Sequence, residues 1–460
     1  MKKITIQTVV AAAALALVFS STAFAKVTAQ EAERLKSELT PVGAEKAGNA
    51  DGSIPAWEGG LTKPPEGLGY KGPGNTRPDP FASDKPILTI NAKNVDQYAA
   101  KLSPGVVAVI KRFPDTFYLD VYKTRRTAAA PQWVYDHTYD NATRCDLTPD
   151  GLGVIANGGR QGIPFPIPKR AEEVVFNDLL TYTGGGLDGS VRFSVVQANG
   201  SRADTTLEWQ MKYPWYDQNG KESDALARML DVSVAWYAEP ANMKGNVVML
   251  WDPLNQSQEP RSAWSYLPGQ RRVRRDPTVA YDTPNTVVGA ICTQDDIYGF
   301  NGALDRYNWK IVGKKEMYIP YNDYQTGLCS MQDLLKPNHY NPKYMRWELH
   351  RVWVIDAELK PGARHIYSHR VLYLDEDTWA AGLADNYDGH GKLWRTWIGG
   401  RSNAYEVPTV IVLEQFFFDL QRSDYAALYL QNDTGKQMLL NKFAPDSVFT
   451  PENVRTLGTR

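Results

Sequence analysis

Cysteine is scarce in this sequence, which has three in 460 residues: Cys145, Cys292 and Cys329. One pair can form a disulfide in an oxidising compartment, and one thiol is then left over. We favour Cys292 with Cys329, because both fall in the segment that we interpret as the main sheet; three unpaired buried thiols are the alternative. The sequence has no CxxC, HxH or HExxH pattern, so we expect no metal site and no cofactor.

Long apolar runs are also missing, apart from one near the start. The run from Val9 to Phe19 follows Lys2 and Lys3 and ends before a small-x-small pattern at residues 23–25. It is too short to span a membrane and is typical of a bacterial secretory signal. We therefore predict a cleaved signal peptide over 1–25 and export to the periplasm of a Gram-negative bacterium. No later run approaches the ~20 residues of a membrane helix.

The chain has little net charge. It has 51 basic and 52 acidic residues, and removing Lys2 and Lys3 with the signal leaves a formal charge of −3. This balance argues against nucleic acid as a partner. The sequence also has no G-x-S-x-G motif and no glycine-rich phosphate loop, which removes two common routes to catalysis.

Residues 26–160 are broken by proline and glycine and predict an irregular N-terminal region that wraps a larger core. Thr28 followed by Glu31 is a capping box that starts one short helix. A second helix is expected to begin at Asn94 and to stop at Pro104-Gly105. Neither helix is long enough to form a domain of its own.

Residues 161–435 predict the core. A helix over Ala171 to Leu180 ends at a triple glycine, and runs with a period of two follow from residue 191 onward. In the run "RMLDVSVAWYAEP" (228–240), alternate residues from Leu230 to Trp236 are apolar, and those between them, from Asp231 to Ala235, are polar or small. Short strands joined by turns favour a mainly β fold with one large, strongly curved antiparallel sheet. The tail 436–460 is expected to pack on this sheet.

The stretch "RSAWSYLPGQRRVRRDP" (261–277) joins an aromatic strand to an arginine strand through a Pro-Gly turn. Trp264 and Tyr266 share one strand face, and Arg272 and Arg274 share one face of the next strand. Guanidinium groups beside aromatic rings suit an anionic headgroup or an acidic partner. The alternative is that the arginines solvate an exposed sheet face. We take these four residues as the candidate ligand- or partner-binding site.

An enzymatic interpretation rests on a few polar residues. His350 alternates with Glu348 and can form a buried acid/base pair, although a structural histidine is the simpler interpretation. Asp375 and Asp377 are a carboxylate pair of the kind that glycan hydrolases use. Any chain of this size offers such pairs, so we expect no catalytic residues and keep a glycan-active hydrolase as an alternative.

Five separated motifs carry a resemblance that covers essentially the whole mature chain. They are "LTPVGAEKAGNADGSIPAW" (39–57), "GIPFPIPK" (162–169), "AWSYLPGQRRVRRDPTVAYDTP" (263–284), "FNGALDRYNWKIVGKKE" (300–316) and "ELHRVWVIDAELKPGARHIYSHRVLYLDEDTW" (348–379). They resemble a family of uncharacterised exported proteobacterial proteins labelled outer-membrane lipoprotein-sorting-protein-like, within or near the lipoprotein-carrier (Lol-like) superfamily.

That resemblance implies an incomplete β-barrel with helices over its apolar concave side. It also implies a non-catalytic carrier of a lipid or other hydrophobic molecule, working with an inner-membrane exporter and an outer-membrane protein. The chain is about twice as long as the small carriers, which weakens the transfer of their activity. A periplasmic adaptor that docks an exporter and binds no small molecule is the other alternative.

Overall fold

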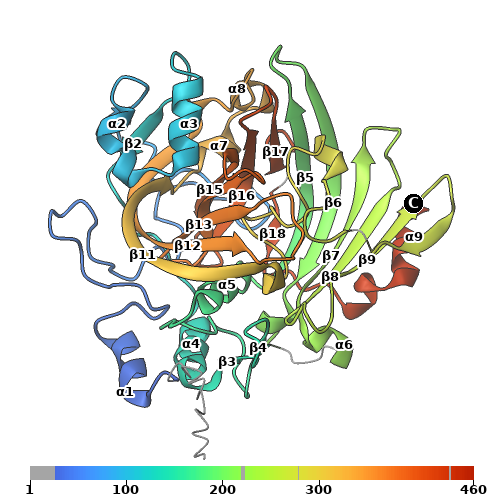
Figure 1. The fold of residues 1–460 in the computed structure, drawn as a ribbon, viewed down its shortest axis with the longest axis horizontal. Coiled ribbons are helices and arrows are strands. Elements are labelled where there is room, and N and C mark those ends of the chain that lie inside the picture. The colour runs from blue at the N-terminus through green and yellow to red at the C-terminus, as the bar shows by residue number, and fades with distance from the viewer. Residues whose placement is uncertain (1–25, 219–222, 278, 435–436, 460) are drawn as a thin grey trace, which may run out of the picture.

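The computed structural model describes residues 26–218, 223–277, 279–434 and 437–459 (Figure 1). The predicted signal segment, 1–25, lies outside the described residues. Within them, the chain folds around one 16-stranded sheet that is not closed into a barrel. The predicted mainly β fold is confirmed.

The sheet has two arms. The first arm contains the strands β5 (Gly186–Val196), β6 (Arg202–Lys212), β7 (Met229–Glu239), β8 (Val247–Pro253), β9 (Ser262–Leu267) and β10 (Arg272–Arg275). The second arm contains β11 (Tyr307–Pro320), β12 (Arg346–Leu359), β13 (His369–Asp375), β14 (Ala381–Tyr387), β15 (Leu393–Ala404), β16 (Thr409–Asp419) and β17 (Tyr425–Leu430). Strands β17 and β5 pair and join the arms into one sheet. Figure 1 shows the first arm on the right and the second to its left.

The N-terminal region adds strands to this sheet. β1 (Leu88–Ile90) pairs with β2 (Leu119–Tyr122), and β2 pairs with β12 in parallel. The other recorded strand pairs are antiparallel, so the expected antiparallel sheet is in fact mixed at this one position. β18 (Leu439–Leu440) pairs with β5 near the other terminus, and β3 (Asp146–Leu147) with β4 (Val154–Ile155) forms a separate hairpin.

The helices are short and lie between or beside the strands. They are α1 (Ala29–Ala32), α2 (Val95–Tyr98), α3 (Pro104–Arg112), α4 (Gln132–Arg144), α5 (Ala171–Leu179), α6 (Asp224–Ala227), α7 (Gln325–Leu328), α8 (Met331–Leu334) and α9 (Pro451–Gly458). The capping box at Thr28 and the helix at Ala171 are confirmed. The helix expected from Asn94 is shorter, and Pro104 begins α3 instead of only ending its predecessor. Ser103 caps α3 by accepting the backbone N–H of Val106. Pro104 fits the first turn of this helix because a proline has no N–H to leave unpaired there.

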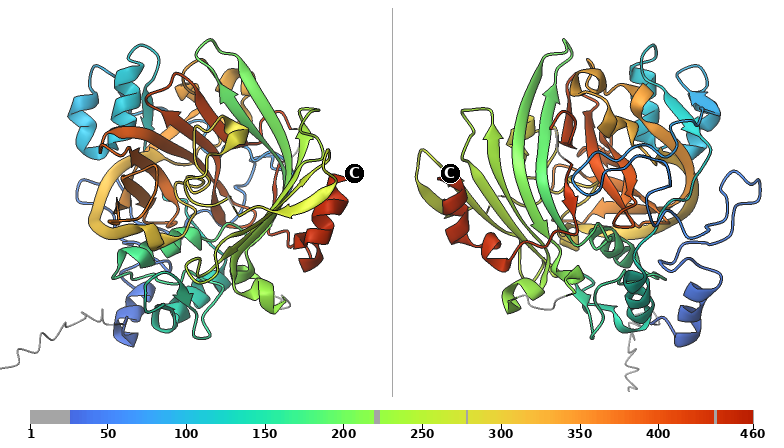
Figure 2. Two further views of the ribbon diagram at one scale, coloured as in Figure 1. Left: turned by 45° about the vertical axis from the view of Figure 1, so that its right-hand side comes forward. Right: turned by 180° about the vertical axis from the view of Figure 1, so that it is seen from behind.

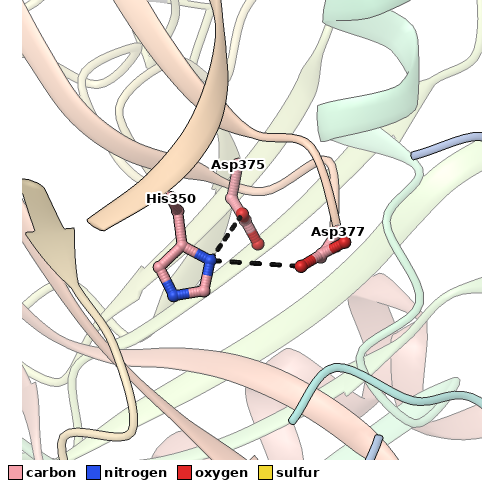
Figure 3. A group of neighbouring side chains, drawn as sticks. All are labelled: His350, Asp375 and Asp377. Atoms are coloured by element: carbon pink, nitrogen blue, oxygen red, sulfur yellow. Dashed lines mark ion pairs between the residues drawn. The ribbon is translucent and has the colours of Figure 1, made fainter. Parts of the chain in front are cut away.

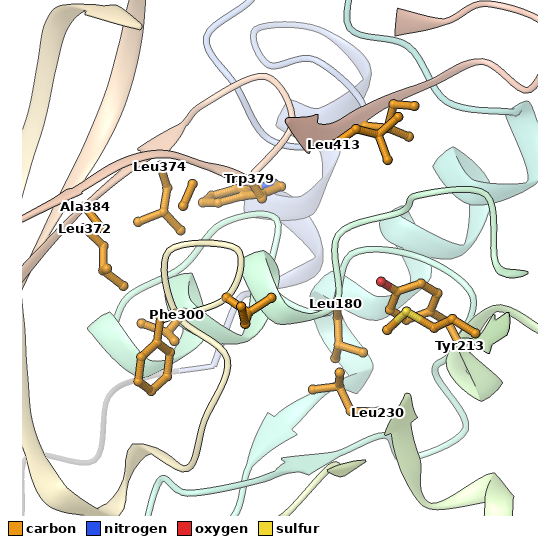
Figure 4. Packing of buried hydrophobic residues seen from close by; sticks show 14 of the residues in the cluster. Leu180, Tyr213, Leu230, Phe300, Leu372, Leu374, Trp379, Ala384 and Leu413 are labelled. Carbon is orange, nitrogen blue, oxygen red and sulfur yellow. The ribbon is translucent and has the colours of Figure 1, made fainter. Parts of the chain in front are cut away.

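One apolar core spans both arms. It contains the buried face of α5 with Val174 and Phe176, strands of the first arm and strands of the second arm. Figure 4 shows part of it, with Leu374 and Trp379 at the upper left, Leu413 at the upper right, and Leu180, Tyr213 and Leu230 at the lower right. A second core lies around α3, β2 and the opposite face of the second arm.

The favoured Cys292–Cys329 disulfide is wrong, because all three cysteines are free. Cys292 lies in the core shared by the two arms, whereas Cys329 follows α7 and packs against the second core. Their side chains therefore belong to different parts of the interior. Burial raises the pKa of Cys145 and of Cys329 to about 12, so these thiols stay protonated near neutral pH.

Candidate functional site: a covered cavity in the first arm

The first arm contains a cavity of about 420 Å³ between its strands and the segment that crosses them. We call residues 279–306 the cover segment; it is yellow in Figure 1. The volume lies within the ~300–1,000 Å³ of small-molecule sites. Its apolar lining residues are Val191, Phe193, Leu207, Trp209, Met211, Ala235, Tyr237, Met243, Val247, Val248, Leu250, Leu267, Val279, Val287, Ile297, Tyr298 and Tyr429.

The alternation of the strands decides which residues line the cavity. Ser233 pairs with Leu250 and Val248 pairs with Ser265, and all four line it. Successive side chains of a strand point to opposite faces, so the neighbours of Ser233 and Ser265 lie on the other face of the sheet. Small side chains at Ser233 and Ser265 leave the space open.

The predicted alternation in β7 is confirmed from Val232 onward, where Val232 and Val234 pack on the outer face. It is wrong at Leu230, which lies with Asp231 beside an internal pocket. The register of β7 and β8 shifts between Met229 and Asp231. Such an irregularity re-aims side chains, and the sequence period does not reveal it.

Buried ion pairs hold the cover segment in place. Arg370 on β13 lies 2.9 Å from Asp295 and 2.5 Å from Asp296 of the cover segment. His365 Nε2 lies 3.0 Å from the same Asp295 carboxylate. Although burial opposes it, Arg370 and His365 hold the pKa of Asp295 below its ordinary value. The second arm thereby fixes a segment that covers the first.

The cavity has a charged inner end. Arg261, just before β9, donates from Nε to Asp252 at 2.5 Å and from Nη2 to the carbonyl of Asn301 at 3.1 Å. Asp231 is the cross-strand partner of Asp252. Burial, aided by the charge of Asp252, raises the pKa of Asp231 well above its usual range.

A smaller pocket of about 60 Å³ continues from this end into the core. Asp231, Met211, Tyr298 and Asn301 line both spaces, so Asp231 lies at their junction. Aliphatic side chains from α5 and β16 supply much of the remaining wall. The apolar space therefore extends from the first arm toward α5.

The four residues proposed from the sequence lie on two faces. Trp264 packs edge to face against Trp251, with ring centroids 5.2 Å apart, and Tyr266 is buried beneath α9. A Cβ placed on Gly458 of α9 would lie 2.2 Å from the Tyr266 ring, which shows how closely the helix covers it. Both aromatic residues are thus on the outer face, away from the cavity.

Arg272 and Arg274 are exposed on β10 and lie on the cavity side of the sheet. The register pairs Arg272 with Leu267 and Arg274 with Ser265, and both partners line the cavity. Directly paired residues share a face, so the turn does not bring these arginines beside Trp264 and Tyr266. Neither arginine lines the cavity itself, and their role in binding stays a prediction.

The polar residues considered for catalysis come together in the second arm (Figure 3). His350 Nδ1 lies 3.8 Å from Asp375 and 4.0 Å from Asp377, and its Nε2 lies 3.2 Å from Glu348. Tyr321 stacks on the imidazole with centroids 3.9 Å apart. The sequence indicated the His350–Glu348 and Asp375–Asp377 pairs separately, and the pairing of β12 with β13 joins them.

The His350 cluster has ligand types that suit a divalent cation, and its three ligand atoms lie within 4.8 Å of one another. Protein cations already balance it, however. Arg126 donates two hydrogen bonds to Asp377, at 2.6 and 2.9 Å, and Arg401 lies 3.5 Å from Asp375. An added divalent ion would leave excess buried positive charge, which disfavours a metal here.

The same cluster is closed to a glycan. Asp375 and Asp377 are buried, and the space that Asp377 lines measures about 30 Å³. That is roughly the volume of one water molecule. Sequence reasoning missed the residues that matter at the cavity, namely Asp231, Asp252, Arg261 and Arg370. The one sequence signal that could have pointed to this site is Asp231, a carboxylate between the apolar residues Leu230 and Val232 of β7.

The fold and the site together define a mainly β protein. Its sheet is curved and not closed, and the sheet and the cover segment line a largely apolar cavity. Its sequence belongs to the family described as "Protein of unknown function (DUF1329)", which matches residues 89–455. An uncharacterized protein of Pseudomonas aeruginosa, PA3922, is 41% identical over 446 residues, which is 95% of each chain. The expected membership of an uncharacterised family is confirmed.

The solved structures that match this chain share little sequence with it. A DUF1329 family protein from Desulfovibrio piger is 16% identical, with a TM-score of 0.42 over 61% of this chain and 95% of its own. A putative outer membrane lipoprotein-sorting protein domain from Vibrio parahaemolyticus is 11% identical, with a TM-score of 0.43 over 62% and 97%. A LolA superfamily protein from Nitrosomonas europaea is 12% identical, with a TM-score of 0.37 over 62% and 100%.

Among the described residues, none of the helices combines the length and the apolar character that a membrane crossing requires.

Proposed function

We propose that this protein is a periplasmic carrier that binds a lipid or other hydrophobic molecule without chemical conversion and passes it on within the cell envelope. The observation that supports this most directly is the 420 Å³ cavity with its apolar strand faces and anchored cover segment. A carrier must shield an apolar cargo from water while it crosses an aqueous compartment. A cavity of ligand size, apolar on most of its wall, provides that shielding.

Native mass spectrometry with organic extraction, on protein purified from the periplasm without detergent, tests this proposal. We expect a stoichiometric apolar molecule to co-purify, and we expect the emptied protein to take up a fluorescent acyl probe. An empty protein that also fails to take up the probe would contradict the carrier function and favour the adaptor.

A filled-cavity variant links the binding to this site. Ala235 lines the cavity, and Ala235→Trp should fill part of it and lower uptake of the acyl probe at least about tenfold. Ala100→Trp makes the same substitution at an exposed position and should leave uptake unchanged. Equal uptake by both variants would place the bound molecule elsewhere.

Docking to an exporter or an outer-membrane partner is assigned to β10. This strand is the last of the path on its side of the sheet, and Arg272 and Arg274 are exposed on it. An arginine pair on an edge strand suits an acidic partner surface, and it also discourages unwanted strand pairing.

Replacing both arginines by Glu should abolish transport or partner binding while leaving the thermal midpoint nearly unchanged. Charge reversal of Lys310 and Lys315, which are exposed on the edge strand β11, is the matched control and should preserve transport. Full transport by the Arg272→Glu/Arg274→Glu variant would remove these arginines from the mechanism.

A further inference from the structure

The inner end of the cavity contains one carboxyl group without a hydrogen-bond partner. Asp231 is 3% exposed, and within the part of the chain that the structure describes its side chain makes no hydrogen bond. It lines both the main cavity and the pocket behind it. A buried polar group is normally hydrogen-bonded, so a partnerless one that faces a cavity points to a ligand.

The protein's own cation near Asp231 is already engaged. Arg261 donates to Asp252 and to the carbonyl of Asn301, and Asp252 is buried with it. The other titratable groups around Asp231 are the phenols of Tyr213, Tyr298 and Tyr429 and the carboxyl group of Asp178, which lines the smaller pocket with it; all four are neutral near pH 7. The groups that carry or can take up a charge beside Asp231 are therefore Asp252 and Arg261, which pair with each other.

This arrangement leaves Asp231 two states. Unpaired, it avoids a buried charge by keeping its proton, and burial accordingly raises its pKa. Beside a cation supplied from outside, it ionises and makes a charge-assisted hydrogen bond, which is stronger than a neutral one. A carboxylate or phosphate headgroup would instead meet a like charge from Asp252.

We propose that the ligand is an amphiphile with a protonated amine, held at the inner end of the cavity with the amine against Asp231 and the apolar chain along the strand faces. The apolar faces of β6 and β8, including Leu207, Val248 and Leu250, accept the chain. This inference rests on the proposed carrier function and specifies the chemical class of its cargo.

Three probes with the same chain test the headgroup: dodecylamine, dodecanol and dodecanoate. Each compound is titrated against a fluorescent acyl probe bound to the purified full chain at pH 7.5, at concentrations below the critical micelle concentration of that compound, and the displacement of the probe is measured. We expect dodecylamine to bind about tenfold more tightly than dodecanol, because a charged hydrogen bond outweighs a neutral one. Dodecanoate should bind most weakly. This comparison uses the unchanged protein and needs no variant.

Asp231→Asn then assigns the preference to this residue. It keeps the side-chain shape and removes the charge, so the amine and the alcohol should bind within about twofold of each other. Affinity for dodecanol should be retained. Asp120→Asn on β2, whose carboxylate accepts from Thr89, is the control and should keep the tenfold preference.

The outcomes separate the two proposals. Binding of the three probes with equal affinity, or tightest binding of dodecanoate, overturns the amine assignment and leaves the carrier function standing. An unchanged amine preference in Asp231→Asn overturns the role of Asp231. If none of the three probes displaces the acyl probe and the acyl probe itself fails to bind, the carrier function is wrong and the amine assignment with it.

Discussion

Asp178 on α5 is a buried carboxyl group that links a helix to the second arm. One of its oxygens accepts the backbone N–H of Ala381 at 2.8 Å, and the other has no partner among the described residues. Burial raises the pKa of Asp178 to about 8, with the Ala381 N–H and Arg401 opposing it. The group therefore carries its proton in the folded protein at neutral pH.

The pH dependence of stability follows with a defined sign. Between pH ~4 and about 8, Asp178 is ionised in the unfolded chain and protonated in the folded one, so folding binds a proton and stability falls as pH rises. Asp178→Asn removes this loss. Relative to the variant, the free energy of unfolding of the unchanged protein should fall by about 1.4 kcal/mol for each pH unit of increase over this range.

Urea unfolding of both proteins at pH 4.5, 6.0 and 7.5 measures the difference. Asp96→Asn, at an exposed position on α2, is the control and should show no such trend. A difference between Asp178→Asn and the unchanged protein that stays constant with pH would mean that Asp178 is ionised in the fold.

At the residue scale, the sequence indicated which polar residues are of interest, but it did not indicate which side chains they contact. His350, Glu348, Asp375 and Asp377 were each singled out, but as two separate pairs. The pairing of β12 with β13, together with the tight turn after Asp375, sets them within 4 Å of the same imidazole. Spacing along the sequence does not report contacts made across strands. The sequence therefore did not predict that Arg126 and Arg401 neutralise Asp377 and Asp375.

At the scale of elements, α9 is the cover of the outer face of the first arm. It lies behind β7, β8 and β9 on the far right of Figure 1 and is seen from behind in Figure 2. Val454 and Leu457 of α9 pack in the cluster that contains Trp264 and Tyr266. The same strands thus bury one face under a helix and present the other to the cavity.

Val454→Asp should detach α9. Val454 is fully buried, and the substitution both loses its burial and places a carboxylate in an apolar cluster, at a cost of about 3 kcal/mol or more. We expect a red shift in tryptophan fluorescence from Trp251 and Trp264. Thr456→Asp, at an exposed position of the same helix, should leave the spectrum unchanged. A normal spectrum for both variants would mean that α9 is not needed to cover these rings.

The sequence predicted the strands of the core, and it predicted the helices α1 and α5, but it did not predict α3. The period of two over 228–240 coincides with β7 within one residue at each end. The helix from Asn94 was misjudged, because Pro104 can end one helix or begin another. Which of these it does depends on Ser103 and on the buried carboxylate of Asp385, which accepts the Gly105 N–H.

At the scale of the whole molecule, the two arms share one interior. The β17–β5 pairing makes the sheet continuous, and the main core contains side chains from both arms and from α5. The Arg370 ion pairs add a second link through the cover segment. Separation of the arms would expose apolar surface on both of them.

We therefore expect one cooperative thermal transition in spite of the chain length. Circular dichroism of the strands and tryptophan fluorescence, to which both arms contribute, should each show one transition with the same midpoint. Two resolved transitions, or midpoints several degrees apart, would show that the arms unfold independently.

The sequence by itself determined the strand pattern, the mainly β class and the family, because these follow from local periodicity and from motifs in order along the chain. The tertiary structure alone decided which face of each strand became the cavity. A register shift at the start of β7 turned Leu230 inward, and α9 covered the face that contains Trp264 and Tyr266. It also set Asp231 beside Asp252 and Arg261, since charge balance at a buried site depends on contacts across strands that no local pattern encodes.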